Sequence, residues 1–521
     1  MYRKLSLLTL LVFFIFGSAL TSAESKELET PKLVQQETDE ISITGKIGNG
    51  NEETPGEWYT GTTPSNLDPN KPILLFVHGL NSTAQTWWED NDMYQTAYDA
   101  GYQTTFLQLH DAGGYNEDMW ENGQLLAEKI IEISDHFNGK PITIVAHSKG
   151  GVDSQAALTY YGAHQYVDNV ITLSSPHHGS QLADLAYSSW ASWLADVIGT
   201  KGDGTYSLQM AEMEDFRSQT DAQPLAYHND YYTFAGTSWG SVFSSTWYGG
   251  MYLSQYGSND GAVTVDSSRL PGGTEVAVGD WDHSSIRTGT TFSIFENHLA
   301  GTHTFNTQKQ PKDQKNNKRI MNQWVHGGQL AEGQDTITIT VEDGVSELHI
   351  NLMTAHEPQS MKLVAPDGSE YPTEFKSIEL NDGVFKGAIS HVTDLKNPEP
   401  GEWTLKIYSE QEDSYLIFND FKTTQKINLN KHIKRNGDLN LTYNMQSQHN
   451  IQKATYTITE SNHASNKMTF TNNANHERHI KLTKPNTVYN VTIDIEGTTN
   501  EGYPFKRTVV ESVKVPGKSN R

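Results

Sequence analysis

The feature that most constrains the fold is a regular alternation between residues 73 and 299. Short apolar runs rich in β-branched and aromatic residues alternate there with longer segments of mixed polarity. The runs are ILLFV (73–77), TTFLQL (104–109), ITIVA (142–146), NVITL (169–173), YYTFAG (231–236) and EVAVG (275–279). Continuous apolar runs of this length are typical of strands buried on both faces.

Between the second and third runs the apolar residues recur at helical spacing. Leu126, Ile130, Ile133 and Phe137 fall on one face of a helix that begins behind the polar Asn116, Glu117 and Asp118. Strands that alternate with amphipathic helices predict an α/β domain, with a mostly parallel sheet covered on both sides.

The pattern changes after residue 306. Residues 307–330 are basic, polar and poor in apolar residues, and we expect them to be a linker. Beyond them apolar residues alternate with polar ones in short runs such as TITITV (336–341) and ELHINL (347–352), separated by Gly, Pro, Asn and Asp. This pattern predicts two small all-β, sandwich-like modules, at 331–424 and 425–521, the second of immunoglobulin or fibronectin type III type.

The N-terminus carries the pattern of an export signal. A basic start (Arg3, Lys4) precedes an apolar run over 5–20 and the small residues Thr21 and Ala23. We expect a signal peptide at 1–23, a flexible leader at 24–57 and a catalytic domain at 58–306, and hence a secreted protein. An uncleaved membrane anchor is the alternative.

Composition excludes several classes of partner. The formal net charge of −25 makes nucleic acid an unsuitable ligand, because phosphate binding needs a basic face. The chain has no cysteine, so disulfides and thiolate metal sites are excluded.

A possible nucleophile lies where the third run meets a helical pattern. Ser148 stands in Ala146-His147-Ser148-Lys149-Gly150-Gly151, directly after ITIVA. A strand that turns sharply into a helix can hold a serine hydroxyl ready for attack, and the turn needs small residues two positions before and after the serine. Ala146 and Gly150 meet that requirement, so we predict Ser148 as the nucleophile of an acyl transfer.

Such a reaction needs backbone N–H groups directed at the developing oxyanion. The residue after the nucleophile, Lys149, is expected to supply one of them. The loop after the first strand reads His78-Gly79-Leu80-Asn81, and Leu80 is placed to supply the other. An ordinary tight turn at His78-Gly79 is the alternative.

The chain order in this fold is serine, acid, histidine. Asp260 follows the fifth strand and His283 follows the sixth, so we predict Asp260 to orient the imidazole of His283, which serves as the base. The alternative candidates are Asp266, Asp280 and Asp282 for the acid and His298 and His303 for the base.

These motifs together resemble a known family. FVHGLNS, VAHSKGG, SSPHHGS and NDGAV are similar to segments of secreted bacterial lipases and esterases of the α/β-hydrolase superfamily, in particular the Gram-positive type with Ala at the elbow. The resemblance covers residues 72–299. It implies cleavage of carboxylic esters by Ser148, Asp260 and His283, with Leu80 and Lys149 as oxyanion donors.

The resemblance carries no metal or cofactor with it. His283 is followed by Ser284 and Ser285, which departs from the calcium site of many relatives, and the zinc site of some thermophilic relatives has no counterpart here. His177 and His178 are adjacent, and neighbouring histidines rarely bind one ion together. We therefore expect neither cofactor nor metal.

Two apolar segments are expected to shape the substrate side. Residues 180–205 are predicted to be a mobile lid, with a plain core helix as the alternative. The aromatic residues between 239 and 256 are predicted to form part of an acyl or polymer surface.

The sequence thus predicts a secreted serine ester hydrolase that acts on lipid or other carboxylic esters, with no stable membrane anchor. An extracellular polyester depolymerase and a catalytically inactive surface-binding protein are the alternatives. The C-terminal modules are expected to bind a cell surface or polymer, or to act as spacers.

Overall fold

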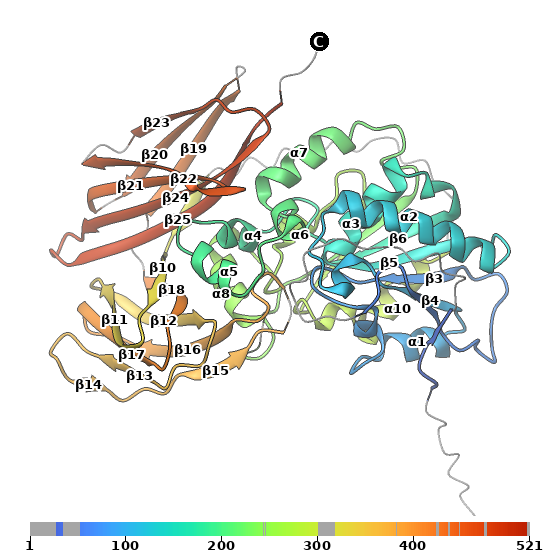
Figure 1. Cartoon of the computed structure of the whole chain (residues 1–521), viewed down its shortest axis with the longest axis horizontal. Coiled ribbons are helices and arrows are strands. Elements are labelled where there is room, and N and C mark those ends of the chain that lie inside the picture. Colours follow the sequence, from blue (N-terminus) through green and yellow to red (C-terminus); the bar gives the residue numbers. More distant parts are fainter. Residues whose placement is uncertain are drawn as a thin grey trace, which may run out of the picture.

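A computed structural model describes residues 28–34, 53–242, 244, 246–300, 318–381, 383–423, 427–435, 438–447, 449–473 and 477–517. The α/β domain lies on one side of the molecule and two all-β units lie on the other (Figure 1). The predicted signal peptide, most of the leader and part of the predicted linker fall outside the described residues. No helix in the described part of the chain is long and apolar enough to cross a membrane.

The α/β domain is built on an eight-stranded sheet with the order β1-β2-β4-β3-β5-β6-β7-β8. Strands β3 to β8 are parallel, and β1 and β2 add an antiparallel edge. All six predicted strands are present. The bounds are β1 (Lys32–Leu33), β2 (Trp58–Thr60), β3 (Ile73–Val77), β4 (Thr104–Leu107), β5 (Ile142–His147), β6 (Val167–Leu173), β7 (Asp230–Gly236) and β8 (Thr274–Gly279).

Helices cover both faces of this sheet, as Figure 1 shows. The predicted amphipathic helix is α2, which begins where the Asp118 side chain accepts hydrogen bonds from two backbone N–H groups and buries Leu126, Ile130 and Ile133. The α-helices are α1 (Met93–Asp99), α2 (Met119–His136), α3 (Lys149–Tyr160), α4 (Gln181–Ala186), α5 (Ser192–Val197), α6 (Asp203–Ser207), α7 (Met210–Thr220), α8 (Trp247–Leu253), α9 (Val265–Ser268) and α10 (Phe292–Phe295).

Short 3₁₀ turns connect these elements. They are η1 (Ala84–Trp87), η2 (His110–Gly113), η3 (Ala163–Tyr166), η4 (Ser254–Tyr256), η5 (Ser285–Arg287), η6 (Gly289–Thr291) and η7 (Glu296–His298). Turn η2 directly follows β4 at the edge of the sheet where the predicted site residues lie.

The first all-β unit pairs two antiparallel sheets around one apolar core that includes Ile339, Leu348 and Trp403. Its five-stranded sheet contains β10 (Gln323–Leu330), β18 (Asp413–Thr423), β12 (Val345–Thr354), β16 (Ile389–Lys396) and β15 (Lys376–Glu379). Its four-stranded sheet contains β11 (Gly333–Val341), β17 (Gly401–Ser409), β13 (Ser360–Val364) and β14 (Glu370–Tyr371).

The second all-β unit repeats this plan around a core that includes Tyr443, Tyr456 and Val491. One sheet contains β23 (Glu477–Leu482), β20 (Leu439–Ser447), β19 (Ile427–Arg435) and β9 (Lys318–Met321). The other contains β22 (His463–Asn473), β21 (Asn450–Glu460), β24 (Thr487–Thr498) and β25 (Pro504–Val515). The predicted α/β fold followed by all-β, sandwich-like units is confirmed.

The segment expected as a linker differs from that expectation. Strands β9 and β10 lie within 307–330, and they enter different units, because β9 pairs with β19 and β10 pairs with β18. Val325 is fully buried although most of its neighbours in sequence are polar. Local composition suggested a linker because the partner strands lie about a hundred residues away.

The α/β domain and the all-β units share one apolar core. It joins Leu182 and Leu194 of α4 and α5 with Val325, Phe385 and Phe418 of the first all-β unit. Helices α4, α5 and α8 lie between the two halves of the molecule (Figure 1). The segment predicted as a lid is therefore covered by the C-terminal units in this structure.

Candidate functional site

The predicted nucleophile lies in a strained turn between β5 and α3. Ser148 has φ 53° and ψ −133°, a backbone conformation that L residues rarely adopt. A Cβ atom on Gly150 would lie 2.4 Å from the His78 carbonyl oxygen, and one on Gly79 would lie 2.7 Å from the Ser148 Cβ. Close packing thus requires glycine at Gly150, as expected of a nucleophile elbow, and at Gly79 in the loop that faces it.

The predicted acid and base lie in direct contact. The Nδ1 atom of His283 is 2.7 Å from Oδ2 of Asp260, and the His283 backbone N–H donates to the Asp260 carbonyl oxygen at 2.9 Å. The other carboxylate oxygen accepts the backbone N–H groups of Ala262 and Val263 at 2.9 and 2.8 Å.

These partners determine the ionisation of Asp260, which is 1% exposed. Burial alone would raise its pKa, but the neighbouring His283 and the hydrogen bonds to the carboxylate outweigh burial, so the pKa is lowered. A carboxylate that stays ionised accepts the proton of Nδ1 and leaves Nε2 as the basic nitrogen.

The competing residues have other partners. Asp266 pairs with Arg269 and Asp280 is exposed, whereas Asp282 accepts the backbone N–H groups of Ser284 and Ser285 at 2.9 and 2.7 Å. His298 stacks on Tyr232, with ring centroids 4.4 Å apart, and is not part of the cleft described below. His303 lies outside the described residues.

His147 is a contributor that sequence reasoning missed. It precedes the nucleophile, is 3% exposed, and its Nε2 donates to the His283 carbonyl oxygen at 2.7 Å. Burial and the nearby His283 hold its pKa well below the usual value, so the ring is neutral. It fixes the backbone of the predicted base. The position of His147 directly before Ser148 is the sequence signal for such a role, but nothing near it in the sequence indicates that its partner is His283.

The predicted oxyanion loop is held by His78. Its Nε2 accepts the Leu109 N–H at 3.0 Å, which places the proton on Nδ1, and Nδ1 donates to the Gly79 carbonyl oxygen at 3.0 Å. Burial lowers the pKa of His78 to about 4, consistent with a neutral ring. This bond pattern fixes the loop that carries Leu80, beside the turn that carries Ser148 and Lys149.

Ser148 and His283 line the same cleft. Most of its wall is apolar, and its members come from the strand-end loops, the α4 and α8 segments and the first all-β unit. They include Leu80, Pro176, Leu182, Leu208, Tyr248, Val263 and Val384. A cleft with such a lining suits an apolar ligand.

A loop of the first all-β unit closes one side of the cleft. Gly383 and Val384 line the cleft, although they are far from Ser148 in sequence. Two hydrogen bonds tie this roof loop (residues 383–387) to Asn81: the Asn81 side chain donates to the Gly383 carbonyl oxygen at 3.2 Å, and Lys386 donates to the Asn81 carbonyl oxygen at 3.1 Å.

The segment predicted as a lid is anchored to the second all-β unit. Trp190 Nε1 donates to Asp494 at 3.0 Å, and Asn490 Nδ2 donates to the Asp184 carbonyl oxygen at 2.6 Å. In the predicted aromatic surface, Tyr248 contributes to the cleft, but Tyr252 packs against Phe418 with ring centroids 6.1 Å apart. Part of that surface therefore forms the contact between the two halves of the molecule.

The adjacent histidines do not share a partner. His177 is buried, with Nε2 3.3 Å from Oγ1 of Thr172, and the His178 backbone N–H donates to Ser267. Over the described ranges, no group of three or more His, Asp and Glu residues is placed to hold a metal ion.

Comparison with known proteins identifies similar sequences and a similar structure. Residues 90–195 match the model of the PGAP1-like alpha/beta domain. The crystal structure of Bacillus licheniformis lipase BlEst2 in its propeptide form is 33% identical, with a TM-score of 0.75, and the match covers 90% of this chain and 99% of that one.

Two curated proteins are similar to part of the chain. Triacylglycerol lipase 2 of Saccharomyces cerevisiae is 26% identical over 164 residues, which are 31% of this chain and 50% of that protein. A triacylglycerol lipase of Pseudarthrobacter phenanthrenivorans is 26% identical over 182 residues, which are 31% of this chain and 53% of that protein. The chain thus spans about half the length of these curated relatives. Because the match to the BlEst2 lipase runs through almost the whole of that protein, the chain belongs to the α/β-hydrolase family of lipases and esterases.

Proposed function

We propose that this protein hydrolyses carboxylic esters of lipids through an acyl-serine intermediate. The observation that carries the proposal is the 2.7 Å contact between His283 Nδ1 and Asp260, with Ser148 in a strained elbow on the same cleft. Ser148 is the nucleophile, His283 the general base and Asp260 the residue that orients the imidazole.

The reaction follows from these roles. His283 Nε2 takes the Ser148 proton as Oγ attacks the ester carbonyl carbon, and the negative charge on the carbonyl oxygen is met by the N–H groups of Leu80 and Lys149. When the tetrahedral intermediate collapses, the carbon–oxygen bond to the alcohol breaks and His283 gives its proton to the departing oxygen. Water then attacks the acyl-serine with the same base and releases the carboxylic acid.

The walls of the cleft support an apolar acyl group. Leu182, Leu208 and Val263 line the same cleft as Ser148. An acyl chain of a lipid ester would bury its surface against these side chains at about 25 cal/mol per Å². The names of the curated relatives, triacylglycerol lipases, agree with such a substrate.

The test is the rate of hydrolysis of p-nitrophenyl esters of short and long acyl chains by the wild type and Ser148→Ala. Loss of nearly all activity in the variant supports the proposal, and the dependence on chain length separates a lipase from a short-chain esterase. Equal rates for both proteins would exclude the acyl-serine mechanism.

The alternatives remain open to direct experiment. A polyester depolymerase would release product faster from a polymer film than from emulsified triacylglycerol. An inactive surface-binding protein would hydrolyse neither substrate and would bind cells or polymer through its C-terminal units.

The location of the protein is also a proposal. The basic and apolar N-terminus supports secretion, with cleavage after Ala23. N-terminal sequencing of protein from the culture medium tests this. A start near Glu24 supports it, and retention of an intact N-terminus in the cell fraction contradicts it.

We further propose that the C-terminal units act as a pro-region that limits access to the cleft. Val384 lines the same cleft as Ser148, and the similar BlEst2 structure is described as a propeptide form. A site-specific protease sequence inserted between residues 307 and 313 would allow the folded chain to be cut. A rise in the rate on long-chain esters after cutting and separation of the fragments supports the role, and an unchanged rate argues against it.

A further inference from the structure

A carboxylate outside the predicted triad lies between the two parts of the predicted oxyanion hole. Asp111 belongs to turn η2 after β4 and is 1% exposed. Neither the cleft nor the predicted triad includes it. Its two oxygens bind different segments of the chain, and these segments carry the two predicted oxyanion donors.

The first oxygen holds the loop after β3. Asp111 Oδ1 accepts the backbone N–H of Asn81 at 3.0 Å. Asn81 directly follows Leu80 and has φ 54°, a left-handed conformation that Asn tolerates better than most residues. The hydrogen bond therefore fixes the turn in which the Leu80 amide lies.

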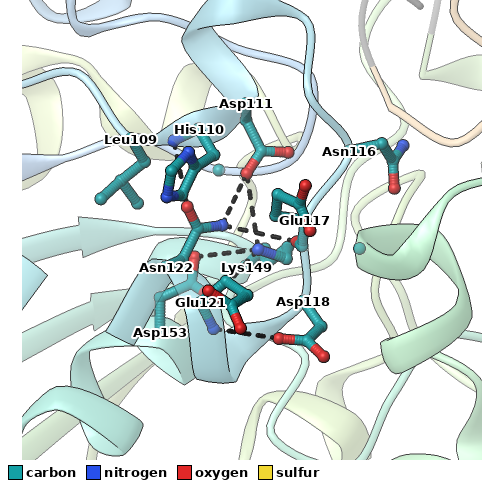
Figure 2. A network of polar contacts seen from close by, with 12 residues as sticks. Leu109, His110, Asp111, Asn116, Glu117, Asp118, Glu121, Asn122, Lys149 and Asp153 are labelled. Atoms are coloured by element: carbon teal, nitrogen blue, oxygen red, sulfur yellow. Dashed lines mark hydrogen bonds and ion pairs between the residues drawn. The ribbon is translucent and has the colours of Figure 1, made fainter. Parts of the chain in front are cut away.

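The second oxygen holds the nucleophile elbow. Lys149 is fully buried, and its Nζ lies 3.4 Å from Asp111 Oδ2. Asn122 Nδ2 of α2 donates to the same oxygen at 2.8 Å. Figure 2 shows Lys149 between Asp111 and Asp153, with Asn122 beside Asp111.

The second carboxylate of this cluster provides a natural comparison. Asp153 lies one helical turn after Lys149 on α3, and its oxygens are 3.0 and 3.2 Å from the same Nζ. It shares the buried ammonium with Asp111, but the link from Lys149 to Asn81 runs through Asp111. One carboxylate joins two segments, whereas the other acts within one helix.

We propose that Asp111 is a positioning residue that sets the distance between the Leu80 and Lys149 amides and so determines how well the oxyanion hole fits the transition state. This inference rests on the proposed ester hydrolysis. A carboxylate has two acceptor oxygens, but an asparagine has one. Asp111→Asn can therefore hold the Asn81 amide or the Lys149 ammonium, not both.

The charge balance makes this substitution informative. In Asp111→Asn the buried Lys149 ammonium keeps Asp153 as its counter-ion, and in Asp153→Asn it keeps Asp111. Each variant leaves one ammonium and one carboxylate, so neither leaves an unpaired buried charge. The difference between the two variants reports the link to Asn81.

The experiment measures kcat and KM of Asp111→Asn, Asp153→Asn and Ser148→Ala on a short-chain p-nitrophenyl ester, together with thermal unfolding of each protein. We expect Asp111→Asn to lose about 10²-fold in kcat with KM little changed, as when one oxyanion donor is displaced. Asp153→Asn is expected to stay within about threefold of the wild-type kcat, since it keeps the link.

Equal kcat values for the two Asp variants would overturn the proposal. If Asp111→Asn does not fold, Asn122→Ala replaces it. That change removes one donor to Asp111 and the acceptor of the His110 N–H, and it leaves the carboxylate. A several-fold fall in kcat at constant KM then supports the proposal, and a rate equal to that of Asp153→Asn overturns it. Full activity of Ser148→Ala would instead overturn the proposed function itself.

Discussion

The two walls of the cleft are held in different ways. The wall at the sheet edge contains Ser148 in a strained turn and His283, which buried hydrogen bonds to Asp260 and His147 hold in place. The roof loop enters from the first all-β unit and contributes Val384 to the cleft. The predicted catalytic residues and the roof of the cleft therefore lie in separate parts of the chain. Changes in the two walls are expected to have different kinetic effects.

Removal of the base gives the largest effect. His283→Ala is expected to lower kcat on p-nitrophenyl acetate by about 10⁶-fold, because the Ser148 proton has no acceptor. Stopped-flow or endpoint release of p-nitrophenol measures this. Substitution of His298, which stacks on Tyr232, serves as the control and is expected to leave kcat near the wild-type value. An active His283→Ala protein would contradict the assignment of the sheet-edge wall to chemistry.

Replacement of the orienting acid gives the next effect. Asp260→Asn is expected to lower kcat by about 10⁴-fold, since an amide facing Nδ1 favours the wrong imidazole tautomer. The control is Asp282→Asn, which alters a carboxylate bonded to Ser284 and Ser285. If the Asp282 variant loses as much activity as the Asp260 variant, the competing acid is the true partner of His283.

The buried ionic cluster of Asp111, Lys149 and Asp153 is expected to affect the pH dependence of stability. Burial raises the pKa of Asp153 to about 7, although Lys149 opposes the shift. Between the usual value of 3.8 and about 7 the folded protein binds a proton that the unfolded chain releases, so this residue makes the free energy of unfolding fall as pH rises.

Asp153→Asn removes that dependence. The free energy of unfolding of the variant, relative to wild type, is expected to rise by up to about 4 kcal/mol from about pH 4 to pH 8. Denaturant unfolding at both ends of the range measures it, with the exposed Asp135→Asn as the control. Parallel pH curves for wild type and Asp153→Asn would contradict the raised pKa.

The smallest expected effect lies in the roof loop. Lys386→Met removes the hydrogen bond to the Asn81 carbonyl oxygen at 3.1 Å. A looser roof is expected to raise kcat/KM about two- to fivefold on long-chain esters and less on acetate. Lys406→Met, at an exposed position of β17, is the control. A large loss of kcat in Lys386→Met would contradict this separation of roles, because the roof loop would then contribute to catalysis.

Sequence alone predicted the parts of the fold that depend on local pattern. The buried strand runs, the period-two segments and the elbow around Ser148 are all visible in short windows, and the chain order of the fold pointed to Asp260 and His283. Their observed contact depends on β7 and β8 lying side by side, which the topology predicts.

The missed features all depend on distant partners. Lys149 is predicted only as a backbone donor: Asp153 lies one turn later on the same helix, but Asp111, the other partner of the buried ammonium, is 38 residues away. Val384 reaches the cleft only through the packing of the first all-β unit on the α/β domain. Strands β9 and β10 were expected as a linker because their partners, β19 and β18, follow much later in the chain.

The residue that reacts with a fluorophosphonate identifies the nucleophile directly. The folded full-length protein would be treated with the probe and digested, and the modified peptide identified by mass spectrometry, with His283→Ala treated in parallel. We predict a single adduct on Ser148 that forms much faster in the wild type than in the variant. An adduct on another residue, or no adduct on Ser148, would contradict the account.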